Sequence, residues 1–264
     1  MSPAPRGRAM ASRTSKDARA RRFVYLPDSH GVFEDPEAVA CSLAFLRAHK
    51  PDVVICGGDH VDFYALSRFD KDPRRALELQ LDLDAGERFV KRVRKAAPNA
   101  KMYYLQGNHE ARLTRWLFSK AAELVNLRGM NVPSLLGLRQ YKCQYVESGA
   151  LQLGAILFKH GNVVRNRAGY TATGELEREG TSGCSGHTHR IGEVSKTNRG
   201  GTYKWVEAGC LCSLRPEYMV GQVPDWQHGL AYGAWAGGRS KRFSLHTAHI
   251  IDGKTMYGDK VVSA

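Results

Sequence analysis

The segment "KMYYLQGNHEAR", residues 101–112, joins a short β-rich apolar run to a stretch with helical periodicity. A turn from strand to helix needs only a glycine and one capping residue. Here Gly107 is followed by an amide, an imidazole and a carboxylate, at Asn108, His109 and Glu110. This surplus of polar groups at the end of a predicted strand indicates a site for chemistry.

Two similar apolar runs precede this segment along the chain. We expect strands at 23–27, 52–56 and 101–106, separated by helices at 35–50 and 77–98. The second helix is apolar on one face and charged on the other, as in a surface helix that covers a sheet. Strands that alternate with helices predict βαβ units, a mainly parallel sheet and right-handed crossovers.

After about residue 140 the pattern changes to short β-rich segments separated by turn signals, such as the one at 198–201. A second sheet packed against the first gives an α/β sandwich. We therefore expect a single domain over 23–264, which agrees with the length of the chain.

Composition limits the classes of protein. The chain has 264 residues, of which 42% are hydrophobic and 25% charged. No apolar run approaches the roughly 18 residues that span a bilayer, so we expect neither a transmembrane protein nor a membrane partner.

Residues 1–22 hold seven basic residues, one acidic residue and no continuous apolar segment. This composition excludes a secretory signal and predicts a disordered basic tail in a cytoplasmic protein, with an organellar transit peptide as the alternative. Removing the tail's net charge of +6 from the total of +13 leaves +7 on the rest of the chain. The excess fits an acidic partner or a solvated basic surface equally well.

The cysteines form no C-x-x-C pair. Because we expect no secretion signal, we also expect them to be reduced, buried and structural. They are Cys41, Cys56, Cys143, Cys184, Cys210 and Cys212.

Polar side chains that can bind metal follow each predicted strand. The first three strands end in "PDSHG", "GGDHVDF" and "QGNHE", and open α/β sheets place their sites at the carboxyl ends of strands. Later, "LFKHGN" ends an apolar run at His160, and "CSGHTHR" supplies His187 and His189 after a short strand at 183–186. Residues i and i+2 of an extended segment face the same side, so Asp28 with His30, and His187 with His189, face one cavity.

Seven nitrogen and oxygen donors converge in this scheme. They are too many for one tetrahedral zinc and suit two metals that share a carboxylate. Two metals roughly 3.5–4 Å apart clamp the attacking and leaving oxygens of a displacement at phosphorus and lower the pKa of a bridging water far below 15.7. The donors are Asp28, His30, Asp59, Asn108, His160, His187 and His189.

The ordered motifs resemble the calcineurin-like metallophosphoesterase superfamily over about residues 23–190. They are D-x-H (28–30), G-D-x-x-D (58–62), G-N-H-E (107–110), H-G (160–161) and G-H-T-H (186–189). The resemblance implies a four-layer α/β/β/α sandwich with two mixed β-sheets flanked by helices. It also implies hydrolysis of phosphoesters with two divalent metal ions, for which we expect Mn, with Fe, Zn, Ni or Mg as alternatives.

The same resemblance assigns roles to the site residues. One metal is expected on Asp28, His30 and His189, and a second on Asn108, His160 and His187, with Asp59 bridging the two. His109 is expected to face the substrate and either stabilise charge on the phosphoryl group or protonate the leaving oxygen, while Asp62 holds its imidazole.

Each residue also has a structural interpretation. Asp28, Asp59 and Asn108 are common helix caps and turn formers. A lone His160 would more often be a core histidine, and Glu110 favours the start of a helix. The ordered set, rather than any single residue, indicates the metal site.

Two features of the motifs indicate the substrate class, one that differs from protein phosphatases and one that resembles phosphodiesterases. Calcineurin-type protein phosphatases usually carry an arginine directly after the second aspartate of G-D-x-x-D, where this chain has Phe63. The G-H-T-H motif instead resembles bacterial and phage phosphodiesterase and nuclease branches. We expect phosphodiesters, either nucleic acid or a nucleotide. The alternatives are a phosphomonoesterase or protein phosphatase and a non-catalytic metal-binding scaffold.

Three residues are candidates for substrate contact: Arg112, His60 and Arg190. If a helix starts at His109, Arg112 lies one turn along the same face and contacts a phosphate. No nucleic-acid-binding module is visible, so any nucleic acid would be bound without sequence specificity. Arg115 follows His109 by six residues. Further basic residues that extend a track for a polyanion, or that form a solvated charged face, are Arg68, Arg74, Arg75 and Arg190.

A final aromatic segment spans 215–229 and includes Tyr218, Trp226 and His228. Such a loop either covers the edge of the sheet, which we favour, or roofs the site and stacks on a base.

Overall fold

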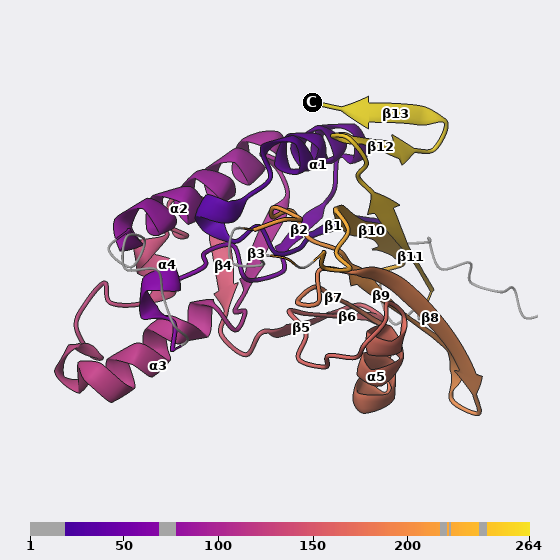
Figure 1. Ribbon diagram of the computed structural model, residues 1–264. Coiled ribbons are helices and arrows are strands. Elements are labelled where there is room, and N and C mark those ends of the chain that lie inside the picture. The colour runs from indigo at the N-terminus through magenta and orange to yellow at the C-terminus, as the bar shows by residue number, and fades with distance from the viewer. Residues whose placement is uncertain (1–18, 69–77, 217–220, 222, 238–241) are drawn as a thin grey trace, which may run out of the picture.

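The computed structural model describes residues 19–68, 78–216, 221, 223–237 and 242–264 (Figure 1). Most of the predicted tail at 1–22 lies outside these residues, as do Arg74, Arg75 and Tyr218.

The first sheet contains the three strands that the sequence predicted. Its strands, in spatial order, are β11 (Phe243–His249), β10 (Gly229–Trp235), β1 (Arg21–Leu26), β2 (Val53–Cys56), β3 (Lys101–Leu105) and β4 (Cys143–Val146). Strands β1 to β4 are parallel, and β10 and β11 add an antiparallel edge. Strand β1 begins two residues before its predicted start, because Arg21 and Arg22 pair with Trp235 and Ala234 of β10.

The second sheet is also mixed. Its strands, in spatial order, are β5 (Ala150–Leu153), β6 (Ile156–Lys159), β7 (Gly183–Ser185), β9 (Gly201–Ala208) and β8 (Ile191–Asn198). Strands β6, β7 and β9 are parallel, while β5 and β8 are antiparallel edge strands. A separate C-terminal hairpin joins β12 (Lys254–Tyr257) to β13 (Lys260–Ser263).

Helices cover the outer faces of both sheets. Helices α1 (Pro36–His49) and α2 (Leu79–Ala96) pack on the first sheet, and α5 (Tyr170–Glu179) packs on the second (Figure 1). The remaining helices are α3 (Glu110–Lys120) and α4 (Val132–Leu135), with 3₁₀ turns η1 (Gly31–Phe33), η2 (Tyr64–Leu66) and η3 (Ala122–Leu124). Helix α1 begins where Pro36 fixes its first turn and the Asp35 carboxylate accepts from the Ala38 N–H at 2.8 Å.

Three apolar clusters fill the three spaces between the four layers. Because strand side chains alternate between faces, Val24 and Leu26 of β1 enter the cluster under α1 and α2, whereas Phe23 and Tyr25 enter the cluster between the sheets. Trp205 belongs to a third cluster beneath α5. The α/β/β/α sandwich is thus confirmed. Among the described residues, no helix has both the length and the apolar composition of a membrane span.

The C-terminal hairpin packs on α1 around a buried histidine. His49, the last residue of α1, is 4% exposed, and its Nδ1 lies 2.9 Å from the Tyr257 hydroxyl. Its ring contacts those of Phe45 and Tyr232. Burial in this aromatic cluster, with a smaller contribution from Arg22, lowers the pKa of His49 from 6.5 to about 4. The folded protein therefore holds this imidazole neutral.

This pKa predicts a loss of stability in mild acid. As the pH falls from 6.5 toward 4, the unfolded chain binds a proton at His49 that the folded chain excludes, so the free energy of unfolding decreases. When the pH falls from 7 to 5, the free energy of unfolding should decrease in both proteins. We expect the decrease to be about 2 kcal/mol smaller for His49→Phe than for the parent protein. Urea unfolding of both proteins without added metal measures this difference. Parallel pH dependences would contradict the buried neutral state.

Candidate metal centre

All seven predicted ligands meet where strand ends of the two sheets converge. They lie in the loops after β1, β2 and β3 of the first sheet and after β6 and β7 of the second. Asp28, His30, Asp59, His160 and His189 are each at most 7% exposed, and the two others are half-buried.

The backbone at these positions is strained. His30, Asp59, His187 and His189 adopt positive φ angles of 53°, 52°, 71° and 59°, which cost non-glycine residues on the order of 1–3 kcal/mol each. Hydrogen bonds between loops hold this geometry, including one from the His30 N–H to the Asp59 carbonyl at 2.8 Å. Strain concentrated at one place is typical of a functional site.

One group of donors surrounds His30. Ligand atoms of Asp28, His30 and Asp59 all lie within 4.8 Å of one another. His30 Nε2 lies 3.0 Å from His189 Nε2, and the latter lies 3.8 Å from Asp28 Oδ1. Two imidazole nitrogens that face each other at 3.0 Å require a proton or a metal cation between them.

A second group surrounds His160. Its Nε2 lies 2.9 Å from Asn108 Oδ1, 3.2 Å from His187 Nδ1 and 3.3 Å from Asp59 Oδ2. Its Nδ1 lies 3.1 Å from the Gly57 carbonyl, which orients the ring toward the other donors.

Asp59 belongs to both groups. Burial alone would raise the pKa of its carboxyl, but the imidazoles of His109, His160 and His30 hold the pKa well below its usual range. Asp59 Oδ1 also accepts from the His109 N–H at 2.9 Å. The centre of the cluster is therefore an ionised carboxylate shared by two sets of nitrogen and oxygen donors, which fits a pair of divalent metal ions.

Two imidazoles of this cluster have raised pKa values. Burial opposes their charge, but the Asp62 hydrogen bond raises the pKa of His30 to about 9, and Asp59 raises that of His160 to about 10. Protons thus balance the buried carboxylates without metal, and a metal ion must displace them to bind.

Glu110 does more than stabilise the start of a helix, because it also connects two loops of the site. It is fully buried, and its Oε2 accepts from the N–H groups of Asp59 and Gly107, both at 2.9 Å. Its Oε1 accepts from the His60 N–H at 3.0 Å and from the Tyr104 hydroxyl at 2.6 Å. The carboxylate ties the loop after β2 to the loop after β3.

Sequence reasoning missed two other buried carboxylates that support the loops. Asp82 of α2 accepts from the N–H groups of Asp62 and Phe63, and Glu207 of β9 accepts from the Thr188 hydroxyl between the last two histidines. For Asp82 the sequence did carry a signal of this role, because Asp82 is an acidic residue on the otherwise apolar face of α2.

His109 lies beside the two groups of ligands, as expected. Its Nδ1 is 3.0 Å from the Asp62 carbonyl and 3.3 Å from Asp62 Oδ2, and its Nε2 is 3.7 Å from Asp59 Oδ2. Arg112 donates to Asp62 Oδ1 at 3.1 Å and to His109 Nε2 at 3.0 Å. Asp62 Oδ2 also lies 3.0 Å from His30 Nδ1, so Asp62 contacts the imidazoles of both His109 and His30.

Two predicted substrate contacts do not reach the site. His60 is fully buried, with its ring stacked 4.2 Å from Phe89 and its Nδ1 2.9 Å from Ser29 Oγ. Burial lowers the pKa of His60 to about 3. Arg190 is 8% exposed and donates to the Arg165 carbonyl at 2.6 Å. Both predictions are wrong, because these side chains turn away from the cavity to complete the packing beneath the loops.

A cavity of about 390 Å³ opens beside the ligands. Its lining includes Arg112 and Trp226 together with His109 and most of the ligands. The Trp226 ring lies 4.3 Å from the ring of His189, so this part of the 215–229 segment walls the site, against the interpretation that we favoured. His228 lies within 2.8 Å of the Cys212 carbonyl and is structural.

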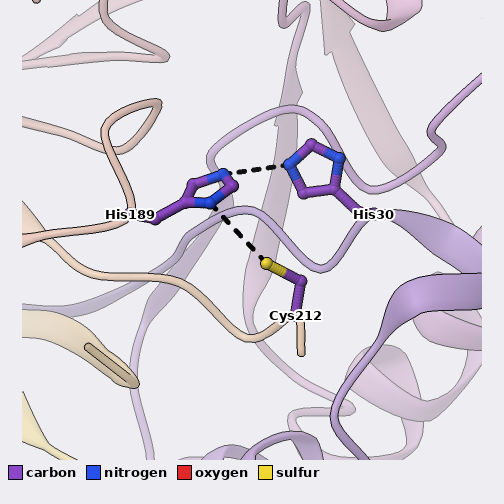
Figure 2. Close-up of side chains that lie close together, drawn as sticks. All are labelled: His30, His189 and Cys212. Atoms are coloured by element: carbon purple, nitrogen blue, oxygen red, sulfur yellow. Dashed lines mark hydrogen bonds between the residues drawn. The ribbon is translucent and has the colours of Figure 1, made fainter. Parts of the chain in front are cut away.

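Figure 2 shows the partners of the two ring nitrogens of His189. Its Nε2 points to His30, and its Nδ1 lies 3.8 Å from the thiol of Cys212. All six cysteines are free and buried, as predicted, although the contact between Cys212 and a predicted ligand was not foreseen.

Together, the four-layer sandwich and the paired donor groups define a metal-binding enzyme scaffold of the α/β class. The family model described as "Calcineurin-like phosphoesterase" matches residues 21–191. The chain belongs to this family and is a metal-dependent hydrolase of phosphoesters.

Two curated relatives are proteins of bacteriophages. The Gene 54 protein of Mycobacterium phage L5 is 25% identical over 225 residues, covering 80% of this chain and 88% of the phage protein. The Gene 54 protein of Mycobacterium phage D29 is 25% identical over 234 residues, covering 80% and 87%.

Similar solved structures share little sequence with this chain. Vps29 from Entamoeba histolytica, solved with Zn²⁺, is 11% identical with a TM-score of 0.44, covering 89% of this chain and 96% of Vps29. YfcE, a phosphoesterase from E. coli, is 14% identical with a TM-score of 0.37, covering 80% and 87%.

Because Asp59 belongs to both donor groups, removing its negative charge should affect both metal ions. Asp59→Asn should lower binding of both metal ions, because the amide removes the negative charge that the two donor groups share. Metal content after equilibrium dialysis against Mn²⁺ measures this, with Asp259→Asn, an exposed aspartate in the β12–β13 turn, as the control. Full retention of one metal would contradict the bridging role.

Proposed function

We propose that the protein cleaves phosphodiesters, in nucleic acid or a nucleotide, with two divalent metal ions, Mn²⁺ first among them. The observation that carries the proposal is Asp59, a buried ionised carboxylate in contact with both donor groups and with His109. We assign the first metal to Asp28, His30 and His189 and the second to Asn108, His160 and His187, with Asp59 bridging. When bound, these ions supply a hydroxide nucleophile and neutralise charge on the phosphoryl oxygens.

The protein's own groups complete the reaction. Arg112 is the one arginine among the described residues that line the cavity, and its guanidinium faces the space beside His109. A phosphate oxygen that enters the cavity competes with His109 Nε2 for this guanidinium, which presents planar, charged donors to it. Nε2 then faces the phosphoryl group, where His109 stabilises charge or, in its protonated form, donates a proton to the leaving oxygen. Asp62 holds both His109 and Arg112.

Preference for a diester follows from the limited positive charge of the cavity. Phe63, which stands where protein phosphatases carry an arginine, is fully buried and offers no contact to phosphate. A diester carries one negative charge fewer than a fully ionised monoester, so Arg112 and the metal ions suffice for it. A phosphomonoesterase, including a protein phosphatase, is the same-class alternative, and a metal-binding scaffold without turnover is the other.

We also propose that the protein is cytoplasmic and forms a single domain. Six buried free thiols support a reducing compartment such as the cytoplasm. The C-terminal strands β10 and β11 extend the sheet formed by β1 to β4, which supports one domain over 23–264.

Two model substrates test the proposal directly. Metal-stripped protein resupplied with Mn²⁺ should hydrolyse bis(p-nitrophenyl) phosphate faster than p-nitrophenyl phosphate, and protein left without metal should hydrolyse neither. A preference for the monoester would favour the phosphatase alternative. Failure to hydrolyse either substrate with metal bound would favour the scaffold.

The role of His109 predicts a dependence on the leaving group. His109→Ala should keep both metal ions while the rate on a diester with an unactivated alkoxide leaving group falls by roughly 10² to 10⁴. The loss should be smaller for p-nitrophenolate, which leaves without a proton. His246→Ala, an exposed histidine on β11, is the matched control. Loss of metal from His109→Ala would show that His109 is itself a ligand.

A further inference from the structure

Helix α3 begins next to the metal centre and runs away from it. His109 is its N-cap residue, and the helix extends outward below α4, toward the lower left of Figure 1. Glu110, Leu113 and Leu117 are its buried residues, and they attach one side of the helix to the body of the protein. The opposite side faces solvent.

The exposed side combines cations with large aromatic rings. Arg112 lines the cavity, and Arg115 donates to the carbonyl of Asn108, a predicted metal ligand. Farther along the helix, Trp116 is 37% exposed and Phe118 is 64% exposed. Spacings of three and four residues place Trp116 on the side of Arg112, and Phe118 on the side of Arg115. With Lys120, these five residues define the α3 surface.

The charged side chains of the α3 surface are all positive, and of these Arg112 is paired with Asp62. The only acidic residue of the helix is Glu110, which is buried and already bonded to three loop N–H groups and a tyrosine. Single exposed apolar residues are common, but two large rings interleaved with cations beside a hydrolytic site are not explained by packing.

We propose that the α3 surface binds single-stranded nucleic acid and holds the nucleotides that flank the phosphodiester at the metal centre. This inference rests on the proposed function and names its substrate class. Arg112 contacts the phosphate at the metal centre, and Arg115 and Lys120 contact the backbone phosphates beside it, while Trp116 and Phe118 stack on unpaired bases. A rise of 1.5 Å per residue puts Phe118 about 12 Å along the helix from Glu110, so only a strand that extends beyond the nucleotides at the metal centre reaches it.

The charge pattern favours this occupant over a second copy of the chain. A twofold contact through α3 would place the same cationic face on both partners, so arginine and lysine would meet like charges. A duplex keeps its bases stacked on each other and offers none to Trp116 and Phe118. A single strand satisfies both the cations and the rings.

The test uses a double variant outside the catalytic machinery. Trp116→Ala with Phe118→Ala should lower kcat/KM for a 20-nucleotide thymidine strand by roughly 10- to 100-fold, since stacking on each ring is lost. Hydrolysis of bis(p-nitrophenyl) phosphate and of a dinucleotide, which is too short to reach Phe118, should stay within twofold. Tyr170→Ala, which removes a 58% exposed ring from α5, is the matched control and should change none of these rates.

Binding without turnover gives a second measurement. Fluorescence anisotropy of the labelled 20-mer with metal-free protein should show the same loss of affinity in the double variant. Lys120→Gln should weaken binding evenly across strand sequences and reduce its salt dependence by about one phosphate contact.

Each other outcome overturns the proposal. Equal losses on the 20-mer and on bis(p-nitrophenyl) phosphate would show that the rings only support the fold. A double variant that cleaves the 20-mer normally but changes from dimer to monomer would make the surface a dimer contact. Parent protein that cleaves the small diester but not the 20-mer would remove this inference and leave the proposed function standing. Hydrolysis of neither would remove both.

Discussion

Asp59 is the buried charge around which the rest of the site is arranged. A carboxylate that is 2% exposed stays ionised only if positive charge and N–H donors surround it. Here the imidazoles of His109, His160 and His30 supply that environment, and they come from three different loops. The order of the strands meets this requirement. Neighbouring parallel strands of the first sheet, and the second sheet that faces them, deliver all these groups to one point.

Buried carboxylates outside the ligand set keep these groups in place. Glu110 joins the loops after β2 and β3, Asp82 holds the backbone of Asp62, and Glu207 holds Thr188 between the two last histidines. The positive φ angles at His30 and Asp59 show that the loops are held in conformations that isolated peptides avoid. Rigid loops of this kind fix side chains before a ligand arrives, which is what metal coordination and charge stabilisation in a transition state require.

The sequence predicted the architecture and the meeting of the seven donors because both depend on local patterns. Apolar runs and helical periodicity identified β1 to β3, α1 and α2, and motifs at strand ends located the donors. The sequence did not predict which way a single side chain points, toward the site or into the core. His60 lies next to Asp59 in the chain, yet the positive φ at Asp59 turns the backbone and sends His60 into the core against Phe89. The contacts of Trp226 and Cys212 with His189 depend on long-range packing that no local pattern records.

The bridging of two metal ions that we propose for Asp59 is tested most directly by electron paramagnetic resonance of the Mn²⁺ protein. Ions that share a carboxylate are magnetically coupled, whereas separate ions give independent signals. We expect that filling the site to two Mn²⁺ per chain replaces the isolated-ion spectrum with that of an exchange-coupled pair. A spectrum of independent ions at the same loading, or saturation at one ion per chain, would contradict it.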